Sequence, residues 1–327
     1  MRIFILDPCG DSSLKIDNSN PWNNLLNQRR DIVQVEDPRN AEFFLINNLT
    51  RRSIRFVRKY CTPKNSALLI WESEVTCPGN FRSKLHRNFK MILAPSPIWA
   101  ARVGGKAFDW PQNNPSNFVG SKQNLRPYRL EKWVMVQSKK YGFTRGELYS
   151  LRNKVLVVNE NDIDLWGYGW NSKSIQNLLK TFVKHRSINV LKLINDYNFN
   201  KRMLLNYRGE TSNKIETMSE YKFALVIENS IDYVSEKLID AIIAGSIPIY
   251  VGPNLENFGI PQKVAINSAP DILEITRKMR EVKENITLQE QTLEAGSDFI
   301  LSNRFQSMIN TKVFASLGNI LAEELLS

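Results

Sequence analysis

Cysteine and histidine are scarce in this 327-residue chain. It contains three cysteines, Cys9, Cys61 and Cys77, and two histidines, His86 and His185. The cysteines form no CxxC pair and no histidine lies close enough to complete a metal site, so the sequence offers no zinc-binding pattern. An odd number of cysteines also fits no disulfide framework, and we expect reduced thiols in a cytoplasmic setting. Neither histidine stands in a motif that would make it the base for a cysteine nucleophile.

Long hydrophobic runs are also missing. No stretch approaches the roughly 18 apolar residues that a membrane-spanning helix needs. The first seven residues, MRIFILD, are too short for the apolar region of a signal peptide and end in an acid, so they predict the first strand of a sheet. We therefore expect a soluble, cytoplasmic protein with at most peripheral membrane association.

Acidic residues are outnumbered, because 44 Lys and Arg face 33 Asp and Glu and the net charge is +11. The basic residues occur mostly as pairs spread between acids, among them Arg51-Arg52, Arg58-Lys59 and Lys139-Lys140. No helix-turn-helix, zinc-finger or RNA-binding signature accompanies them, so nucleic acid is not the expected partner. Attraction to a nucleotide diphosphate, or to an anionic membrane that carries a glycolipid, accounts for the positive net charge equally well.

Strand and helix patterns alternate along the chain, which predicts an α/β fold in two domains. The expected first-domain strands are 1–6, 32–35, 42–46 and 67–71, with helical stretches at 23–30 and 53–60. A polar, proline-bearing segment at 110–127 reads as a connection. We predict an N-terminal domain over 1–128, a C-terminal domain over 129–300 and a helical tail over 301–327.

The richest segment lies in the second domain. Two short apolar runs, 223–227 and 247–251, have the composition of strands buried on both faces. A helical pattern between them, capped by Asp232 or Ser235 and ended by Gly245, predicts a right-handed crossover between parallel strands. The polar corner 228–237 then lies where the helix N-terminus offers free N–H groups to a phosphate, and Lys237 adds a full positive charge there.

This segment resembles the signature of the α1,3/4-fucosyltransferases, glycosyltransferase family 10. The matching elements are Tyr-Lys-Phe at 221–223, Glu-Asn-Ser at 228–230, Asp-Tyr-Val-Ser-Glu-Lys at 232–237 and Ala-Gly-x-x-Pro at 244–248. The similarity extends upstream to about residue 133 and is thin before that. The resemblance implies a glycosyltransferase-B architecture, with two Rossmann-like domains facing a central cleft. It also implies transfer of L-fucose from GDP-fucose to a sugar hydroxyl.

The resemblance assigns roles in donor binding to several residues of the second domain. Arg152 falls where the family keeps an arginine for the nucleotide phosphates, and Lys237 is its partner. Tyr233 and Glu236 are expected to contact phosphate, ribose or fucose, and Asn229 lies in the same pocket. Two weaker candidates are Gly169, in the turn 164–170, and Glu228, which also fits a supporting role through hydrogen bonds to backbone N–H groups.

The catalytic base is expected near residues 68–81 of the first domain, where a fainter similarity covers a strand and the loop after it. Glu72 and Glu74 both follow the apolar run 67–71, so either would project from the carboxyl end of a strand. The order Glu-Ser, then Thr and Pro, favours Glu72, and Glu74 remains the alternative. A carboxylate that only caps the following loop is the structural alternative for both.

These assignments predict an inverting fucosyltransferase that acts on an oligosaccharide or glycolipid acceptor, with O3 of N-acetylglucosamine as the expected position. The Asp-x-Asp sequence at 162–164 resembles a metal site of another glycosyltransferase architecture, but it enters a predicted strand without further ligands. We expect no required cofactor, although Mn²⁺ could stimulate. The alternatives left open are a glycosyltransferase-B enzyme that uses a UDP-sugar, a non-catalytic glycan-binding module and a basic nucleic-acid-binding protein.

Overall fold

The computed structural model describes residues 1–7, 14, 32–115, 128–170, 176–185, 189–201 and 205–326. Cys9 and the helix predicted at 23–30 lie outside these residues, as does most of the predicted connection 110–127. The chain divides into two compact units, one of Met1–Asn114 with Gln306–Ser327 and one of Pro115–Phe305. The boundaries predicted from the sequence, after residues 128 and 300, remain a proposal beside this grouping.

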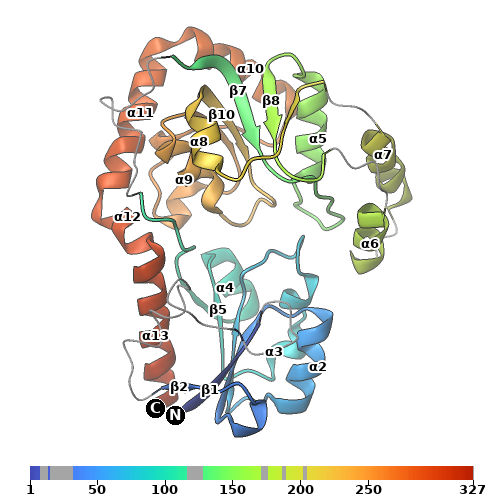
Figure 1. Ribbon diagram of the computed structural model, residues 1–327, viewed down its shortest axis with the longest axis vertical. Coiled ribbons are helices and arrows are strands. Elements are labelled where there is room, and N and C mark those ends of the chain that lie inside the picture. Colours follow the sequence, from blue (N-terminus) through green and yellow to red (C-terminus); the bar gives the residue numbers. More distant parts are fainter. Residues whose placement is uncertain are drawn as a thin grey trace. The chain divides into compact units, whose positions relative to one another are not determined.

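The first unit is built on a parallel six-stranded sheet (Figure 1). Its strands, in spatial order, are β2 (Val33–Gln34), β1 (Arg2–Leu6), β3 (Phe43–Asn47), β4 (Ser66–Leu69), β5 (Met91–Ala94) and β6 (Lys106–Ala107). The helices that precede residue 114 are η1 (Pro38–Asn40), α2 (Arg51–Tyr60), η2 (Pro78–Phe81), α3 (Ser83–His86) and α4 (Pro97–Val103). The central strands β3, β4 and β5 are buried along their whole length. That burial is why they are almost entirely apolar.

The C-terminal helix completes the core of this first unit. Helix α12 (Asn303–Met308) leads into α13 (Asn310–Leu326), whose Phe314 and Leu317 pack in one cluster with Ile3 and Ile5 of β1. The backbone of Gln112 also bonds to this segment, donating to Met308 O and accepting from Asn310 N. The segment expected to be a separate helical tail thus supplies side chains to the N-terminal core.

The second unit holds another parallel six-stranded sheet. Its strand order is β12 (Ile266–Asn267), β11 (Ile247–Val251), β10 (Tyr221–Ile227), β7 (Leu130–Val136), β8 (Ile163–Trp166) and β9 (Tyr207–Gly209). Its helices are α5 (Tyr149–Val158), α6 (Gln176–His185), α7 (Val190–Lys201), α8 (Lys214–Ser219), α9 (Glu236–Ile243), η3 (Leu255–Phe258), η4 (Gln262–Val264), α10 (Ile272–Glu284) and α11 (Ile286–Leu301).

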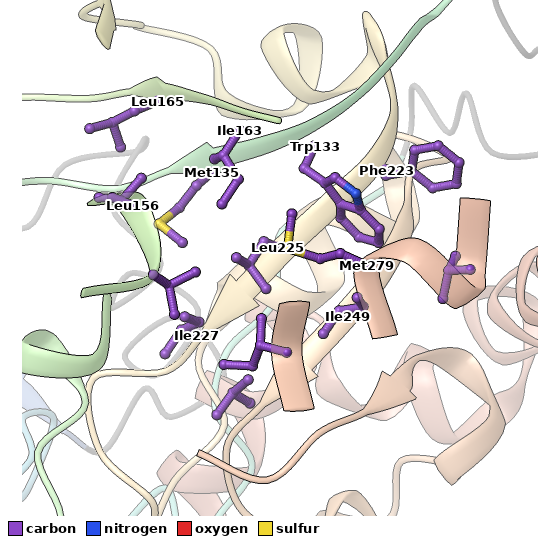
Figure 2. Packing of buried hydrophobic residues seen from close by; sticks show 14 of the residues in the cluster. Trp133, Met135, Leu156, Ile163, Leu165, Phe223, Leu225, Ile227, Ile249 and Met279 are labelled. Atoms are coloured by element: carbon purple, nitrogen blue, oxygen red, sulfur yellow. The ribbon is translucent and has the colours of Figure 1, made fainter. Parts of the chain in front are cut away.

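An apolar core lies between this sheet and the helices that cover it. Figure 2 shows Trp133 and Phe223, whose rings stack with centroids 4.9 Å apart, next to Met279 of α10. Strands β10 and β11 pair in parallel, with Phe223 opposite Ile247, and α9 connects them. The strand-helix-strand unit expected from the sequence is therefore present. It brings the end of β10 and the start of α9 to the same edge of the sheet.

Candidate functional site

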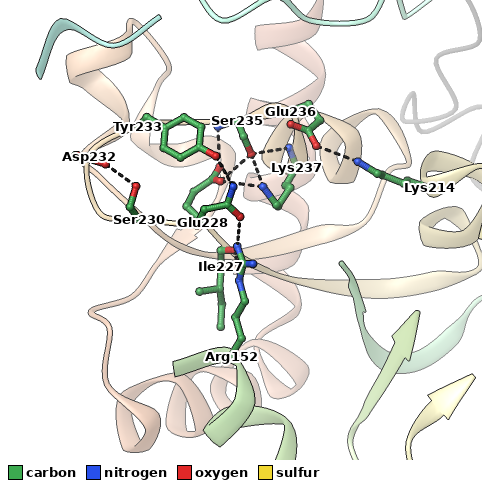
Figure 3. Close-up of polar contacts among 11 residues, drawn as sticks. Arg152, Lys214, Ile227, Glu228, Ser230, Asp232, Tyr233, Ser235, Glu236 and Lys237 are labelled. Atoms are coloured by element: carbon green, nitrogen blue, oxygen red, sulfur yellow. Dashed lines mark hydrogen bonds and ion pairs between the residues drawn. The ribbon is translucent and has the colours of Figure 1, made fainter. Parts of the chain in front are cut away.

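The polar corner between β10 and α9 is organised around the carboxylate of Glu228. This side chain is fully buried, and Ser235 donates to it from its backbone N (2.9 Å) and from Oγ (2.7 Å). Lys237 Nζ lies 3.3 Å from the same carboxylate (Figure 3). A buried carboxylate is stable only when it is paired and hydrogen-bonded, and Glu228 meets both conditions. Glu228 thus fixes the loop that leads into α9.

Lys237 lies in the first turn of α9. Its side chain is 14% exposed, and Nζ also donates to Ser235 Oγ over 2.7 Å. Ser235 is the N-cap of the helix, since Oγ accepts from Lys237 N. A helix N-terminus has unsatisfied N–H groups and a partial positive charge, so the ammonium group reinforces a field that already favours anions.

Arg152, on α5, lies buried against the end of β10, with only 3% of its surface exposed. Its guanidinium donates to Ile227 O from Nε (3.0 Å) and from Nη2, and to Asn229 Oδ1 (2.9 Å). It also lies over the ring of Tyr149, 4.8 Å from the centroid. Burial lowers the pKa of Arg152. In this structure the guanidinium holds the main chain of the corner, and its predicted contact with phosphate stays a prediction.

Asn229 and Tyr233 form the other side of the corner. Asn229 Nδ2 donates to the Tyr233 hydroxyl, while Asn229 Oδ1 accepts from Arg152. Tyr233 is 2% exposed, whereas Asn229 is half-buried. Arg152, Asn229 and Tyr233 are thus joined in one chain of hydrogen bonds, which brings together residues 81 positions apart in the sequence, from 152 to 233.

Glu236 belongs to a second charged group at the start of α9, which the sequence did not reveal. Lys214 Nζ, from α8, lies 2.9 Å from Glu236 Oε1. Burial alone would raise the pKa of Glu236, but Lys237 and Lys214 outweigh it and hold that pKa at about 2. Asp240, one turn further on, is buried, and burial together with the Glu236 charge raises its pKa to about 7. The spacing of Glu236 and Asp240 was the available signal for this pair, whereas nothing in the sequence pointed to Lys214.

The turn after β8 lies at the same edge of the sheet, because parallel strands end on the same side. Gly169 adopts φ +84°, a backbone conformation that residues other than glycine rarely adopt. Trp170 Nε1 donates to Gln137 O over 2.7 Å, and Lys139 Nζ lies 6.0 Å from the centre of the Trp170 ring. Burial lowers the pKa of Lys139. This lysine is a further cation at the edge.

The two candidate bases lie in the first unit, after β4. Glu72 is half-buried, and its backbone N donates to Asn48 Oδ1 over 3.1 Å. Glu74 Oε2 lies 2.7 Å from Arg102, whose guanidinium lies over the ring of Phe81, 4.6 Å from its centroid. The Glu74 carboxylate is thus held in an ion pair with an arginine of α4.

Both aspartates of the Asp-x-Asp sequence form ion pairs with basic side chains. Asp162 lies 3.0 Å from Lys283, and Asp164 lies 3.3 Å from Lys132 and 2.8 Å from Arg208. Within the described residues, no group of three or more His, Cys, Asp or Glu side chains could hold a metal ion.

Among the described helices, none is long and apolar enough to cross a bilayer.

Part of the chain is similar in sequence to known fucosyltransferases. Residues 159–288 match the model of the family described as "Glycosyltransferase family 10 (fucosyltransferase) C-term". A fucosyltransferase-like protein of Arabidopsis thaliana is 35% identical over 85 residues, 24% of this chain and 17% of its own length. The 4-galactosyl-N-acetylglucosaminide 3-alpha-L-fucosyltransferase 9 of Mus musculus is 37% identical over 98 residues, 28% of this chain and 27% of its own length. The chain thus spans well under half of these relatives.

Two solved structures share the fold. Anabaena Alr3699/HepE in complex with UDP and glucose gives a TM-score of 0.56 at 11% identity, covering 99% of this chain and 100% of its own. An alpha1,3-fucosyltransferase with GDP gives 0.53 at 14% identity, covering 100% and 90%. These likenesses confirm the glycosyltransferase-B fold expected from the sequence. The match over residues 159–288 shows that this part of the chain is similar in sequence to glycosyltransferase family 10, the fucosyltransferase family.

Proposed function

We propose that the protein is an inverting fucosyltransferase that moves L-fucose from GDP-fucose to a hydroxyl of an oligosaccharide or glycolipid. The observation that carries this proposal is the corner 228–237. It lies within the segment that matches the family model, and it sets Lys237 at the N-terminus of α9. The mouse relative is named for 3-alpha transfer to a galactosyl-N-acetylglucosaminide, which supports O3 of N-acetylglucosamine as the acceptor position.

In this proposal the donor diphosphate binds at the start of α9. Negative charge grows on the diphosphate as the bond to fucose breaks, so fixed positive charge there stabilises the transition state more than the ground state. Lys237 supplies a compact charge and the helix supplies N–H groups. Arg152 acts with them by holding Asn229 and the end of β10 in place. Tyr233 and Glu236 complete the donor site, with Glu236 ionised at neutral pH.

The proposed base is Glu72. Its carboxylate accepts the proton of the acceptor hydroxyl while the hydroxyl oxygen attacks the anomeric carbon of fucose. The bond from that carbon to the diphosphate breaks on the opposite face, so GDP leaves with the bonding electron pair and the configuration inverts. Because Lys237 and the helix N-terminus offset the charge on GDP, the step requires no metal cofactor. A divalent ion such as Mn²⁺ can still stimulate by pairing with released GDP.

The decisive experiment measures nucleotide preference and transfer on the same protein. Calorimetry with GDP, UDP and ADP is expected to show tight binding of GDP alone. Incubation with GDP-fucose and a galactosyl-N-acetylglucosamine acceptor is expected to give a fucosylated product, largely undiminished by EDTA. Preference for UDP would favour an enzyme that uses a UDP-sugar. Glycan binding without nucleotide binding would indicate a non-catalytic module.

A further inference from the structure

Three asparagines form a buried network where the strands of the first sheet end. Asn47, Asn48 and Asn80 are 0%, 5% and 0% exposed. Asn47 Nδ2 donates to Leu6 O over 2.8 Å, and Asn47 Oδ1 accepts from Trp71 Nε1 over 2.8 Å. The network therefore connects the ends of β1 and β3 to the segment that follows β4.

Asn48 is the centre of this network. Its Oδ1 accepts three hydrogen bonds, from Trp71 N (2.8 Å), Glu72 N (3.1 Å) and Asn80 Nδ2 (2.9 Å). Among the described residues other than glycine, Asn48 alone has a positive φ, at 60°. A left-handed conformation is unfavourable for most side chains, and asparagine tolerates it better than most. Such backbone strain persists where contacts with the surrounding structure stabilise it, and it often occurs at functional sites.

Asn80 binds the backbone of Glu72 on its carbonyl side. Its Nδ2 donates to Glu72 O over 2.8 Å, while its Oδ1 accepts from Leu49 N over 2.6 Å. The neighbouring Gly79 permits this close approach, since a Cβ atom there would lie 1.8 Å from Leu49 O. Both the N–H and the C=O of Glu72 are thus bound by asparagine side chains. The position of the Glu72 Cα is fixed from two directions, which leaves the side-chain torsions to direct the carboxylate.

We propose that Asn48 and Asn80 are positioning residues for the Glu72 carboxylate in the transfer reaction. This inference rests on the proposed function, in which Glu72 is the base. A base works only within hydrogen-bond reach of its proton, and a displacement of about 1 Å can reduce a rate about a hundredfold. The network explains how a base on a loop keeps a fixed position without regular secondary structure around it.

A matched pair of variants separates positioning from general stability. Asn48→Asp keeps an oxygen that can accept all three hydrogen bonds, and aspartate also tolerates a positive φ. Asn80→Asp keeps the acceptor for Leu49 N but removes the donors to Glu72 O and Asn48 Oδ1. Each variant adds one carboxylate to the same network, so the difference between them reports the lost donors rather than the added charge.

We expect Asn80→Asp to lower kcat roughly tenfold to a hundredfold, with the KM for GDP-fucose unchanged. We expect Asn48→Asp to keep kcat within a few fold. Its pH profile should shift, because the new negative charge disfavours ionisation of Glu72 and moves the acidic limb of kcat/KM to higher pH. Equal kcat values for both variants and the wild type would overturn the proposal.

Amide hydrogen exchange at Trp71 and Glu72 tests the network without any activity. Both amides should be protected in the wild type and in Asn48→Asp. They should exchange much faster in Asn48→Gly, which keeps the positive φ and loses the acceptor. Fast exchange in the wild type would overturn the inference. A wild type with protected amides that transfers no sugar would instead refute the proposed function, and with it the role of Glu72 as base.

Discussion

Lys237 Nζ lies 3.3 Å from the fully buried carboxylate of Glu228, and that carboxylate also accepts two hydrogen bonds from Ser235. The pair fixes the ammonium group at the N-terminus of α9. A buried carboxylate left without a cation would be strongly unfavourable, so each member of the pair depends on the other. The same lysine therefore has two separable effects, one on the stability of the fold and one on anion binding.

Replacing Lys237 with alanine is expected to weaken GDP binding about tenfold to a hundredfold, because a hydrogen bond between charged groups is worth about 1.5–3 kcal/mol. The free energy of unfolding should fall as well, since Glu228 loses its cation. Calorimetry and urea unfolding measure the two effects. The double variant Lys237→Met with Glu228→Gln removes both charges, and it should recover part of the stability while GDP binding stays weak. Wild-type affinity in a folded Lys237→Ala protein would show that the ammonium contributes nothing to the donor site.

Replacing Arg152 with lysine is expected to reduce both stability and GDP affinity, although the positive charge is kept. A lysine cannot reproduce the planar fork that bonds to Ile227 O and to Asn229 at once. The unsatisfied carbonyl and amide should cost about 1–3 kcal/mol in urea unfolding. The control is Arg277→Lys at an exposed pair with Glu281, where a change within about 0.5 kcal/mol is expected. Undiminished stability with lost GDP affinity would instead indicate that Arg152 acts directly on the ligand.

Glu72→Gln is expected to keep its fold and its GDP affinity while losing transfer, because the amide keeps the shape of the side chain but cannot accept the proton. A positioned base contributes about 10²–10⁴-fold, which sets the expected drop in kcat. Glu74→Gln is the matched control, and it should keep most of its activity since Glu74 is already paired with Arg102. If Glu74→Gln is the inactive variant, the base lies two residues further along the loop.

Asp240→Asn is expected to stabilise the protein most at alkaline pH and clearly less in mild acid. The folded-state pKa of Asp240 is raised from 3.8 to about 7, so its contribution is present below 3.8 and is lost as pH rises through 7. Asparagine avoids the buried charge, and at about 1.4 kcal/mol per pKa unit the gain at pH 8.5 amounts to a few kcal/mol. Urea unfolding at pH 5 and pH 8.5 measures this difference. An equal gain at both pH values would show that Asp240 does not titrate in this range.

The strands and the corner were predictable because their signals are local. Strand β11 coincides with the predicted apolar run 247–251, since a strand buried on both faces must be apolar along its length. Ser235 was a predicted cap, and serine is suited to bind the free N–H groups of a helix. The position of Lys237 in the first turn of the helix followed from the same reasoning, because the capping residue fixes where the helix begins.

Tertiary structure alone decided the rest. The periodic apolar residues of α13 require a buried face, but periodicity does not say that the face packs on Ile3 and Ile5 at the other end of the chain. The burial of Arg152 and the pairing of Lys214 with Glu236 likewise depend on where separate elements meet. The hydrogen bonds that Asn48 Oδ1 accepts span 23 to 32 residues. Such contacts form only after the strands have paired, so no local pattern in the sequence encodes them.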